Sequence, residues 1–175
     1  MRDIIKYLQL DPKKFKEKTL LGKISAAKNE YIGPEQYAIA AGGDFLYKKY
    51  AAVYTEYQNR LRQNNALDFD DLLLKSIDIL EDTENGVRER YSRYMEHILV
   101  DEFQDVDANQ YKLLKLLAGN DNEVTVVGDP DQTIYTWRGA DVSIILNFDI
   151  DFAGAQTISL EQNYRSTGNI LRIAN

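Results

Sequence analysis

Two short runs of apolar residues, each followed at once by acidic residues, constrain the fold of this chain more than any other feature. His97–Val100 leads into an Asp-Glu pair, and Glu123–Val127 leads into a Gly-Asp-Pro-Asp turn. Both runs have the length and the β-branched residues of buried strands, and a third run, Gln156–Leu160, resembles them. Segments with helical periodicity, Asp107–Ala118 and Asp141–Phe148, separate the three runs. This alternation predicts an α/β protein with a parallel, doubly wound sheet.

The residues that follow the first two predicted strands are candidates for ligand binding. Ligands of open α/β sheets bind beyond the carboxyl ends of the strands, where Asp101 and Glu102 and the segment Gly128–Gln132 are expected. Magnesium usually takes one or two carboxylates together with water and phosphate oxygens. An adjacent Asp and Glu therefore fits a magnesium–nucleotide complex, in which the first acid holds the metal and the second deprotonates the attacking water. The alternative is that both are ordinary solvated loop residues.

Charge is distributed unevenly along the chain. Residues 1–66 contain 12 Lys and Arg against 7 Asp and Glu, a charge of +5, whereas residues 67–175 contain 9 against 21, a charge of −12. The two parts sum to the formal net charge of −7. This asymmetry indicates two units with different partners, the basic one being the candidate for contact with nucleic acid.

The basic part has the pattern of a helical unit. Asp11-Pro12 is typical of a helix start, Gly33-Pro34 breaks the chain before another helix, and Asp44 is expected to cap a long helix that ends at about Gln63. Four tyrosines of that helix, interleaved with Lys and Arg, could form a face on which bases stack. The alternative, which we favour, is that the tyrosines pack with their hydroxyls at the solvent edge.

Cysteine and histidine usage excludes several kinds of site. The chain has no cysteine and one histidine, so disulfides, thiolate nucleophiles and zinc centres are excluded. His97 lies in a predicted buried strand and is expected to be a packed histidine. The amino-terminal residues are too polar for a signal peptide, and no apolar run is long enough to span a bilayer. We therefore expect a cytoplasmic protein without membrane association.

Three sequence blocks resemble motifs of one family. Asp101–Asp105 (DEFQD), Val126–Ala140 (VVGDPDQTIYTWRGA) and Leu160–Thr167 (LEQNYRST) resemble the second, third and fourth motifs of the UvrD/Rep/PcrA family of superfamily-1 DNA helicases. Leu67–Leu74 (LDFDDLLL) is similar to the helix that precedes these motifs. The resemblance covers about residues 45–175, with the motifs in the family's order. It implies a partial RecA-like, P-loop NTPase sheet preceded by a helical insertion subdomain.

The resemblance implies a role for each residue of the nucleotide site. Asp101, in the Walker B position, would bind Mg²⁺ of a magnesium–ATP complex, and Glu102 would be the catalytic base. Gln132 would sense the γ-phosphate, because an amide can donate to phosphate and accept from water. Tyr164 would stack against the adenine. Arg165 would reach the γ-phosphate as an arginine finger, with a planar fork that lysine lacks.

The resemblance also implies residues that bind single-stranded DNA. Trp137, the only tryptophan, would stack on a base, with Tyr135 and Arg138 nearby. Phe69 is a further candidate for DNA contact. The alternatives are that Trp137 is a hydrophobic anchor and that Arg138 pairs with a neighbouring acid.

The family comparison predicts the domain organisation. Residues 1–66 would belong to the helical insertion, 67–160 to a partial motor domain, and 161–175 to the lead-in of a second motor domain. The chain lacks the phosphate-binding pattern GxxxxGK[ST], which the family carries before the point where this chain begins. We therefore expect an internal piece of a 3′-to-5′ helicase and translocase that does not hydrolyse ATP by itself. A sheet without the P-loop strand would expose edges that favour self-association.

Two alternative functions fit the same residues. One is a non-catalytic DNA-binding or interaction module that keeps the motor fold without the motor. The other is a subunit of a helicase–nuclease, in which the same motifs occur.

Overall fold

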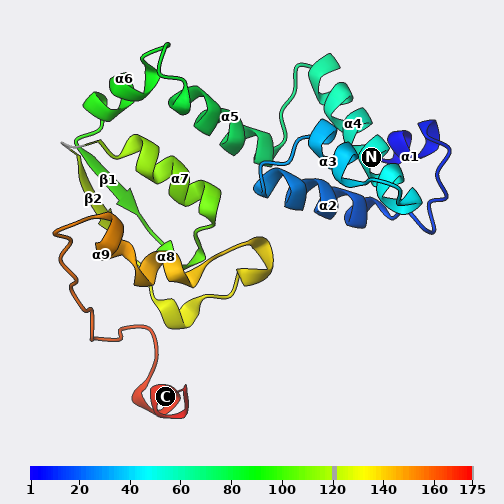
Figure 1. Cartoon of the computed structure of the whole chain (residues 1–175). Helices are drawn as coiled ribbons and strands as arrows, with labels where there is room; N and C mark the ends of the chain where they lie inside the picture. The colour runs from blue at the N-terminus through cyan, green and yellow to red at the C-terminus, as the bar shows by residue number, and fades with distance from the viewer. Residues whose placement is uncertain (120–121, 175) are drawn as a thin grey trace.

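The computed structural model describes residues 1–119 and 122–174 and divides into a helical part and an α/β part (Figure 1). The elements in chain order are α1 (Arg2–Tyr7), α2 (Glu17–Asn29), α3 (Pro34–Ala40), α4 (Phe45–Gln63), α5 (Phe69–Glu81), α6 (Val87–Tyr94), β1 (His97–Val100), the 3-10 helix η1 (Phe103–Asp105), α7 (Ala108–Leu117), β2 (Glu123–Val126), the 3-10 helices η2 (Pro130–Gln132) and η3 (Thr136–Arg138), α8 (Val142–Leu146), α9 (Phe148–Asp151) and α10 (Gly168–Ala174).

The helical part is built around α4. Asp44 caps α4 as predicted, because its carboxylate accepts hydrogen bonds from the backbone N–H groups of Leu46 and Tyr47. The helix packs through a continuous apolar core against α1 and α2. The buried members of that core are Ile4, Ile5, Leu10, Phe15, Leu20, Ile24, Ala27, Val53 and Tyr54. Tyr54 is buried, which confirms the packing of this tyrosine, but its hydroxyl donates to the Ile32 carbonyl rather than lying at the solvent edge.

The helix start predicted at Asp11-Pro12 is wrong. Asp11 Oδ1 accepts from the backbone N–H of Lys13 at 2.9 Å, and the residues form a turn. The following helix, α2, begins at Glu17. The short polar side chain of Asp stabilises an Asx turn and a helix cap by the same hydrogen bond, so the dipeptide alone does not distinguish the two.

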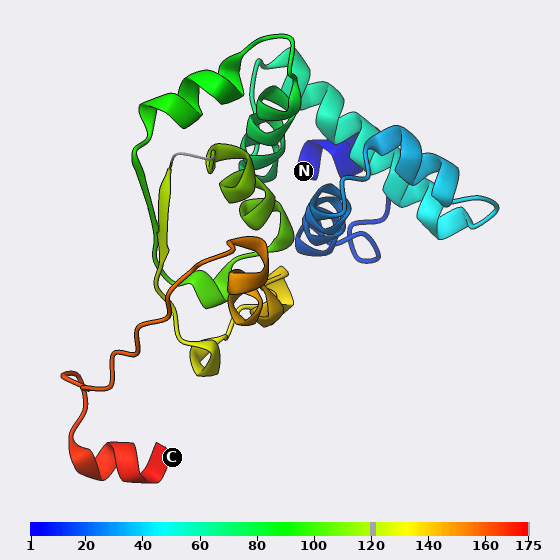
Figure 2. The same ribbon diagram turned by 60° about the vertical axis from the view of Figure 1, so that its left-hand side comes forward.

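The α/β part contains a parallel sheet of two strands joined through α7. β1 and β2 pair from His97 opposite Glu123 to Val100 opposite Val126. Apolar side chains on the inner face of the sheet pack around the buried residues Phe103, Tyr111 and Leu114. Figure 2 shows α7 alongside the strands, with the helices of the amino-terminal part beyond it. The predicted parallel pairing of the first two strands is confirmed.

His97 is exposed, which corrects its predicted burial. It lies on the outer face of the sheet, where its Nδ1 is 3.1 Å from the Glu123 carboxylate of the paired strand. Leu99, on the same face, is also exposed. Within the described part of the structure, other side chains therefore cover the inner face of β1, and its outer face is exposed.

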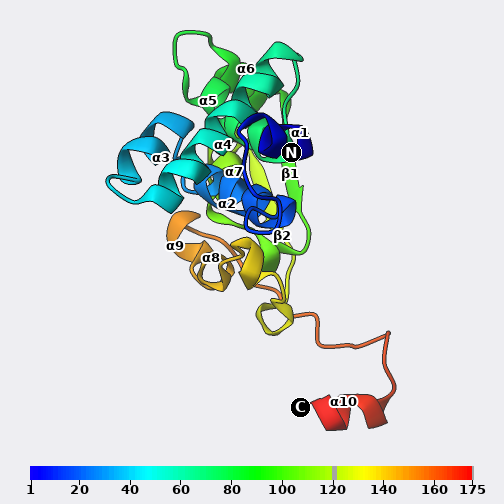
Figure 3. The same cartoon turned by 90° about the vertical axis from the view of Figure 1, so that its right-hand side faces the viewer.

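The predicted third strand, Gln156–Leu160, is wrong. The structure assigns no strand to this segment, and the sheet of the described ranges contains β1 and β2. Ile158 and Leu160 are exposed, so the segment lacks the burial and the hydrogen-bonded neighbour that a strand requires. Figure 3 shows the chain after α9 leaving the body as an extended segment that ends in α10.

A buried lysine connects the helical part to the α/β part. Lys28, at the end of α2, is 2% exposed, and its Nζ lies 2.6 Å from Asp68 Oδ2 and 2.8 Å from Asp71 Oδ1. Asp68 is the N-cap of α5, and Tyr57 of α4 also donates to its Oδ2 at 3.0 Å. Burial by itself would raise the pKa of Asp68, but the hydrogen bonds from Lys28, Asp71 and Tyr57 outweigh it and lower that pKa.

A second hydrogen bond ties α2 to the α/β part. The side chain of Asn109, in the first turn of α7, donates to the backbone carbonyl of Asn29 at 2.8 Å. The end of α2 therefore holds the first turns of both α5 and α7. Since α7 follows directly after the loop that ends β1, these contacts fix the helical part against the base of the candidate site.

Candidate functional site

The carboxyl ends of β1 and β2 place two candidate loops side by side. The strand pairing extends one step into the loops, because Val127 N donates to the Val100 carbonyl at 2.8 Å and Phe103 N donates to the Val127 carbonyl at 2.9 Å. The segment from Asp101 to Asp105 therefore lies next to the segment from Gly128 to Gln132. This juxtaposition is the one predicted for parallel strands.

Asp101 and Glu102 occupy a strained turn at the end of β1. Asp101 Oδ1 accepts from the backbone N–H of Glu102 at 2.9 Å. Glu102 has a φ of 50°, the left-handed region that non-glycine residues adopt at a cost of order 1–3 kcal/mol. Its carboxylate Oε2 accepts from Gln104 Nε2 at 2.8 Å. The turn exposes both carboxylates to solvent and holds the second one in place.

A cleft of about 440 Å³ opens between β1 and α7 at this turn. Its polar lining consists of Asp101, Glu102, Asp105 and Gln110, and the rest is apolar. Asp105 Oδ1 is buried without a hydrogen-bond partner in the described structure. A buried carboxylate oxygen in this state is costly unless another group satisfies it.

The acidic residues of this turn suit a magnesium ion that phosphate oxygens also coordinate. Within residues 1–119 and 122–174, no group of three or more Asp, Glu, His or Cys could hold a metal ion alone. Magnesium does not need such a group, because it keeps several waters and binds through one or two carboxylates plus phosphate oxygens. Asp101, with one carboxylate oxygen engaged in the turn, fits this role.

The second loop holds Gln132 through its own backbone and side chains. Asp129 accepts from Asp131 N at 3.0 Å through Oδ1 and from Gln132 Nε2 at 2.7 Å through Oδ2. Pro130 begins η2, the short 3-10 helix that ends at Gln132. Gln132 is exposed, and its amide nitrogen donates a hydrogen bond to Asp129 of the same loop.

Trp137 and Tyr135 form an aromatic pair on the continuation of the second loop. Their ring centroids are 6.3 Å apart at an interplanar angle of 51°, and Trp137 is 75% exposed. Trp137 lies in η3, whose C-cap is Gly139 with a φ of 98°. The side chain of Arg138 is outside the described part of the structure. The remaining pair is an accessible aromatic surface suited to stacking.

The other predicted site residues lie on separate elements. Tyr164 and Arg165 are exposed on the extended segment before α10, which leaves the body in all three views (Figures 1 to 3). Phe69 is 91% exposed in the first turn of α5, directly after the Asp68 cap held by Lys28. The structure therefore brings Asp101, Glu102 and the Gln132 loop together and leaves these three residues apart from them.

Sequence reasoning assigned no role to Gln104 or Lys28, which organise the site and its support. Gln104 belongs to the Asp101–Asp105 motif and is buried, but the sequence of a turn does not reveal which of its side chains points inward. Lys28 had a detectable signal. It follows Leu20 and Ile24 at steps of four, so a charged residue occupies the buried stripe of α2.

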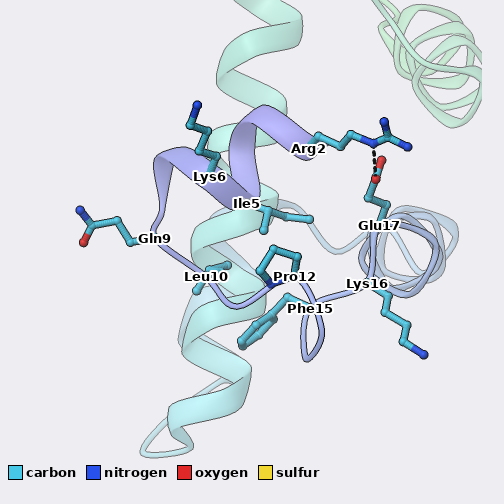
Figure 4. Close-up of a pocket in the computed structure, with 9 residues that line it drawn as sticks. All are labelled: Arg2, Ile5, Lys6, Gln9, Leu10, Pro12, Phe15, Lys16 and Glu17. Atoms are coloured by element: carbon cyan, nitrogen blue, oxygen red, sulfur yellow. Dashed lines mark hydrogen bonds and ion pairs between the residues drawn. The ribbon is translucent and has the colours of Figure 1, made fainter.

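A second cleft, of about 870 Å³, lies in the helical part (Figure 4). Its lining includes the apolar residues Ile5, Leu10 and Phe15. Lys6, Gln9 and Lys16 also line it, but the polar ends of their side chains point outward. Arg2 Nε donates to Glu17 Oε1 at 2.6 Å at one side. Since polar groups do not converge on this cleft, it lacks the features of a nucleotide site.

The fold and the acidic strand end define an α/β protein with a candidate ligand site at the carboxyl edge of a parallel sheet. The chain belongs to the UvrD/REP helicase family, because the model of that family's N-terminal domain matches residues 1–153. This confirms the family resemblance and the partial α/β character of the chain. The described helices include none with the length and apolarity needed to cross a bilayer.

Relatives match over the full length of the chain. It is 47% identical over 175 residues to the ATP-dependent DNA helicase PcrA of Bacillus subtilis. The PcrA proteins of Leuconostoc citreum and Staphylococcus epidermidis are 45% and 46% identical over the same length. In each case the whole of this chain is covered, and it spans 23% to 24% of the relative's length.

Proposed function

We propose that this chain is part of an ATP-dependent 3′-to-5′ DNA helicase that translocates on single-stranded DNA. The observation that carries the proposal is the contact between two loops, one with the acids Asp101 and Glu102 and the other continuing to Trp137. Family membership and the similarity to proteins named ATP-dependent DNA helicase support it.

The nucleotide side of the proposal assigns one task to each residue. Asp101 would hold Mg²⁺, which would neutralise charge on the phosphates of ATP. Glu102 accepts the proton of the attacking water, and the bond from Gln104 orients its carboxylate for this task. Gln132 contacts the γ-phosphate. Arg165 would reach the γ-phosphate, and Tyr164 would stack against the adenine.

The DNA side of the proposal rests on exposed aromatic residues. Trp137 stacks on a base, and Tyr135 and Arg138 contact neighbouring nucleotides. Phe69 supplies a further contact from α5. Stacking of this kind does not depend on sequence, because every base has a π-face. It therefore suits a protein that moves along a strand.

Replacing Trp137 with Ala is expected to weaken binding of single-stranded DNA by about 5- to 150-fold. One stacked base is worth about 1–3 kcal/mol, and that energy is lost with the indole ring. Fluorescence anisotropy of a labelled oligothymidylate measures the affinity without relying on tryptophan emission.

Tyr94→Ala is the matched control, because Tyr94 is an exposed aromatic residue at the end of α6. It is expected to bind the oligonucleotide like the wild type. Equal affinities of Trp137→Ala and the wild type would remove Trp137 from the DNA site. A wild-type chain that does not bind the oligonucleotide at low salt would contradict the DNA side of the proposal.

The 175-residue chain is expected not to hydrolyse ATP, with or without single-stranded DNA. Its sequence contains no GxxxxGK[ST] segment, whose backbone N–H groups and lysine hold the phosphates during hydrolysis. Release of inorganic phosphate measures the rate, and Glu102→Gln reveals the contribution of contaminating enzymes. DNA-stimulated hydrolysis that disappears in Glu102→Gln would show that this chain suffices for the reaction.

A further inference from the structure

Gln104, on the first strand-end loop, is buried against the second loop, and its side chain forms a hydrogen bond within each of them. It is 2% exposed, and its Nε2 donates to Glu102 Oε2 at 2.8 Å. Its Oε1 accepts from the backbone N–H of Asp129 at 3.1 Å. An amide is uncharged, donates at its nitrogen and accepts at its oxygen, so this side chain satisfies both neighbours at once.

The loop of Asp129 is shaped to receive this amide. A Cβ on Gly128 would lie 2.7 Å from Gln104 Oε1 and 2.9 Å from Ile145 Cδ1. Only a glycine therefore allows the backbone of the second loop to approach Gln104 this closely. The contact between the two loops is therefore buried and closely packed.

The far end of the second loop returns to the same turn. Asp141 N donates to the Val106 carbonyl at 3.2 Å, and Asp107 and Ala140 form an isolated antiparallel bridge. Residues 104–107 thus hold both ends of the 128–141 loop, on which Trp137 lies. The end at Val106 and Asp107 is held by backbone contacts, whereas at the Asp129 end the side chain of Gln104 adds a hydrogen bond to the backbone pairing of Val127.

We propose that Gln104 is a positioning residue that links the carboxylate of Glu102 to the 128–141 loop. A displacement of Glu102 is passed through the Gln104 amide to Asp129, and from there to the loop with Trp137. The link itself rests on the observed hydrogen bonds, whereas its consequence for DNA rests on the proposed function. Gln104 does not contact the reacting atoms, so its contribution is to place Glu102 and the loop relative to one another.

The first test is a double-mutant cycle read at the Asp129 amide. Hydrogen exchange of Asp129 N–H is expected to be about five- to tenfold faster in Gln104→Met, which removes both hydrogen bonds with little change of volume. Glu102→Ala is expected to accelerate the same exchange when Gln104 is present and to have no further effect in Gln104→Met. Equal effects of Glu102→Ala in both backgrounds would overturn the link.

The second test reverses the direction of the hydrogen bond. Gln104→Glu places two carboxylates together, so exchange at Asp129 is expected to be faster than in the wild type. Adding Glu102→Gln supplies a donor to the new carboxylate and is expected to return exchange to within about twofold of the wild type. Failure of this rescue in a folded double variant would overturn the proposal.

Controls separate the link from a loss of folding and from the proposed function. Gln63→Met changes an exposed glutamine at the end of α4 and is expected to alter neither exchange nor stability. Urea unfolding of each variant identifies any that fail to fold, and the reversed pair remains informative in that case. Affinity for labelled oligothymidylate is expected to fall with Gln104→Met and to recover in the reversed pair. If the wild type does not bind DNA, the exchange measurements still decide the link.

Discussion

Replacing Lys28 with Met is expected to lower the free energy of unfolding by about 3–5 kcal/mol. The substitution leaves the carboxylates of Asp68 and Asp71 without the ammonium group that now lies 2.6 Å and 2.8 Å from them. Removing one partner of a buried ion pair is strongly destabilising, because an uncompensated charge remains in a poorly solvated place. Since Asp68 caps α5, the first turn of α5 is also expected to loosen against α2.

Urea unfolding followed by far-ultraviolet circular dichroism measures this loss. Lys75→Met is the matched control, because Lys75 pairs with Asp78 at the surface, and a change below about 0.5 kcal/mol is expected. The triple variant Lys28→Met, Asp68→Asn, Asp71→Asn removes the stranded charges and retains an N-cap. It should recover part of the lost stability. A Lys28→Met chain within about 1 kcal/mol of the wild type would show that the network contributes little.

Replacing Phe103 with Ala is expected to cost about 3–5 kcal/mol of stability and to disorder the candidate site. Phe103 is 0% exposed and makes edge-to-face contacts with Tyr111 and Phe148, at centroid distances of 6.1 Å and 5.5 Å. Truncating a buried aromatic ring removes its transfer free energy and leaves a cavity. Because Glu102 and Gln104 flank this residue, their hydrogen bond should weaken in the same variant.

Phe69→Ala provides the same chemical change on an exposed side chain. Phe69 is almost fully exposed, so the expected change in stability is within about 0.5 kcal/mol. Urea unfolding measures both variants, and near-ultraviolet circular dichroism reports the packing of the aromatic cluster. A loss below about 1 kcal/mol in Phe103→Ala would mean that the cluster collapses around the missing ring or does not stabilise the fold.

Local patterns predicted several elements correctly because the interactions that form them are local. Asp44 caps α4 and Asp107 caps α7 through bonds to backbone N–H groups two and three residues away. β1 and the amino-terminal end of β2 also lie at the predicted positions. In each case the side chain that determines the structure and the backbone that it stabilises belong to the same short segment.

The errors arose where a segment depends on a distant partner. Gln156–Leu160 has the composition of a strand, but a strand also requires a neighbour in the sheet, and composition does not supply one. His97 was expected to be buried because its strand is apolar, yet burial depends on what covers each face. The roles assigned to Tyr164 and Arg165 remain predictions, because their segment leaves the body before α10.

The sequence by itself determined the family, the parallel strand pair and the acidic residues that end the first strand. These features depend on consecutive residues, because a strand and the loop at its carboxyl end are neighbours in the chain. The tertiary structure alone decided that Lys28 is buried against Asp68 and Asp71, and that Gln104 joins Glu102 to the Asp129 loop. Both depend on contacts between distant parts of the sequence: Gln104 and Asp129 are 25 residues apart, and Lys28 and Asp71 are 43 residues apart. Which residues are buried together, and which form hydrogen bonds at such separations, is decided only when the chain packs.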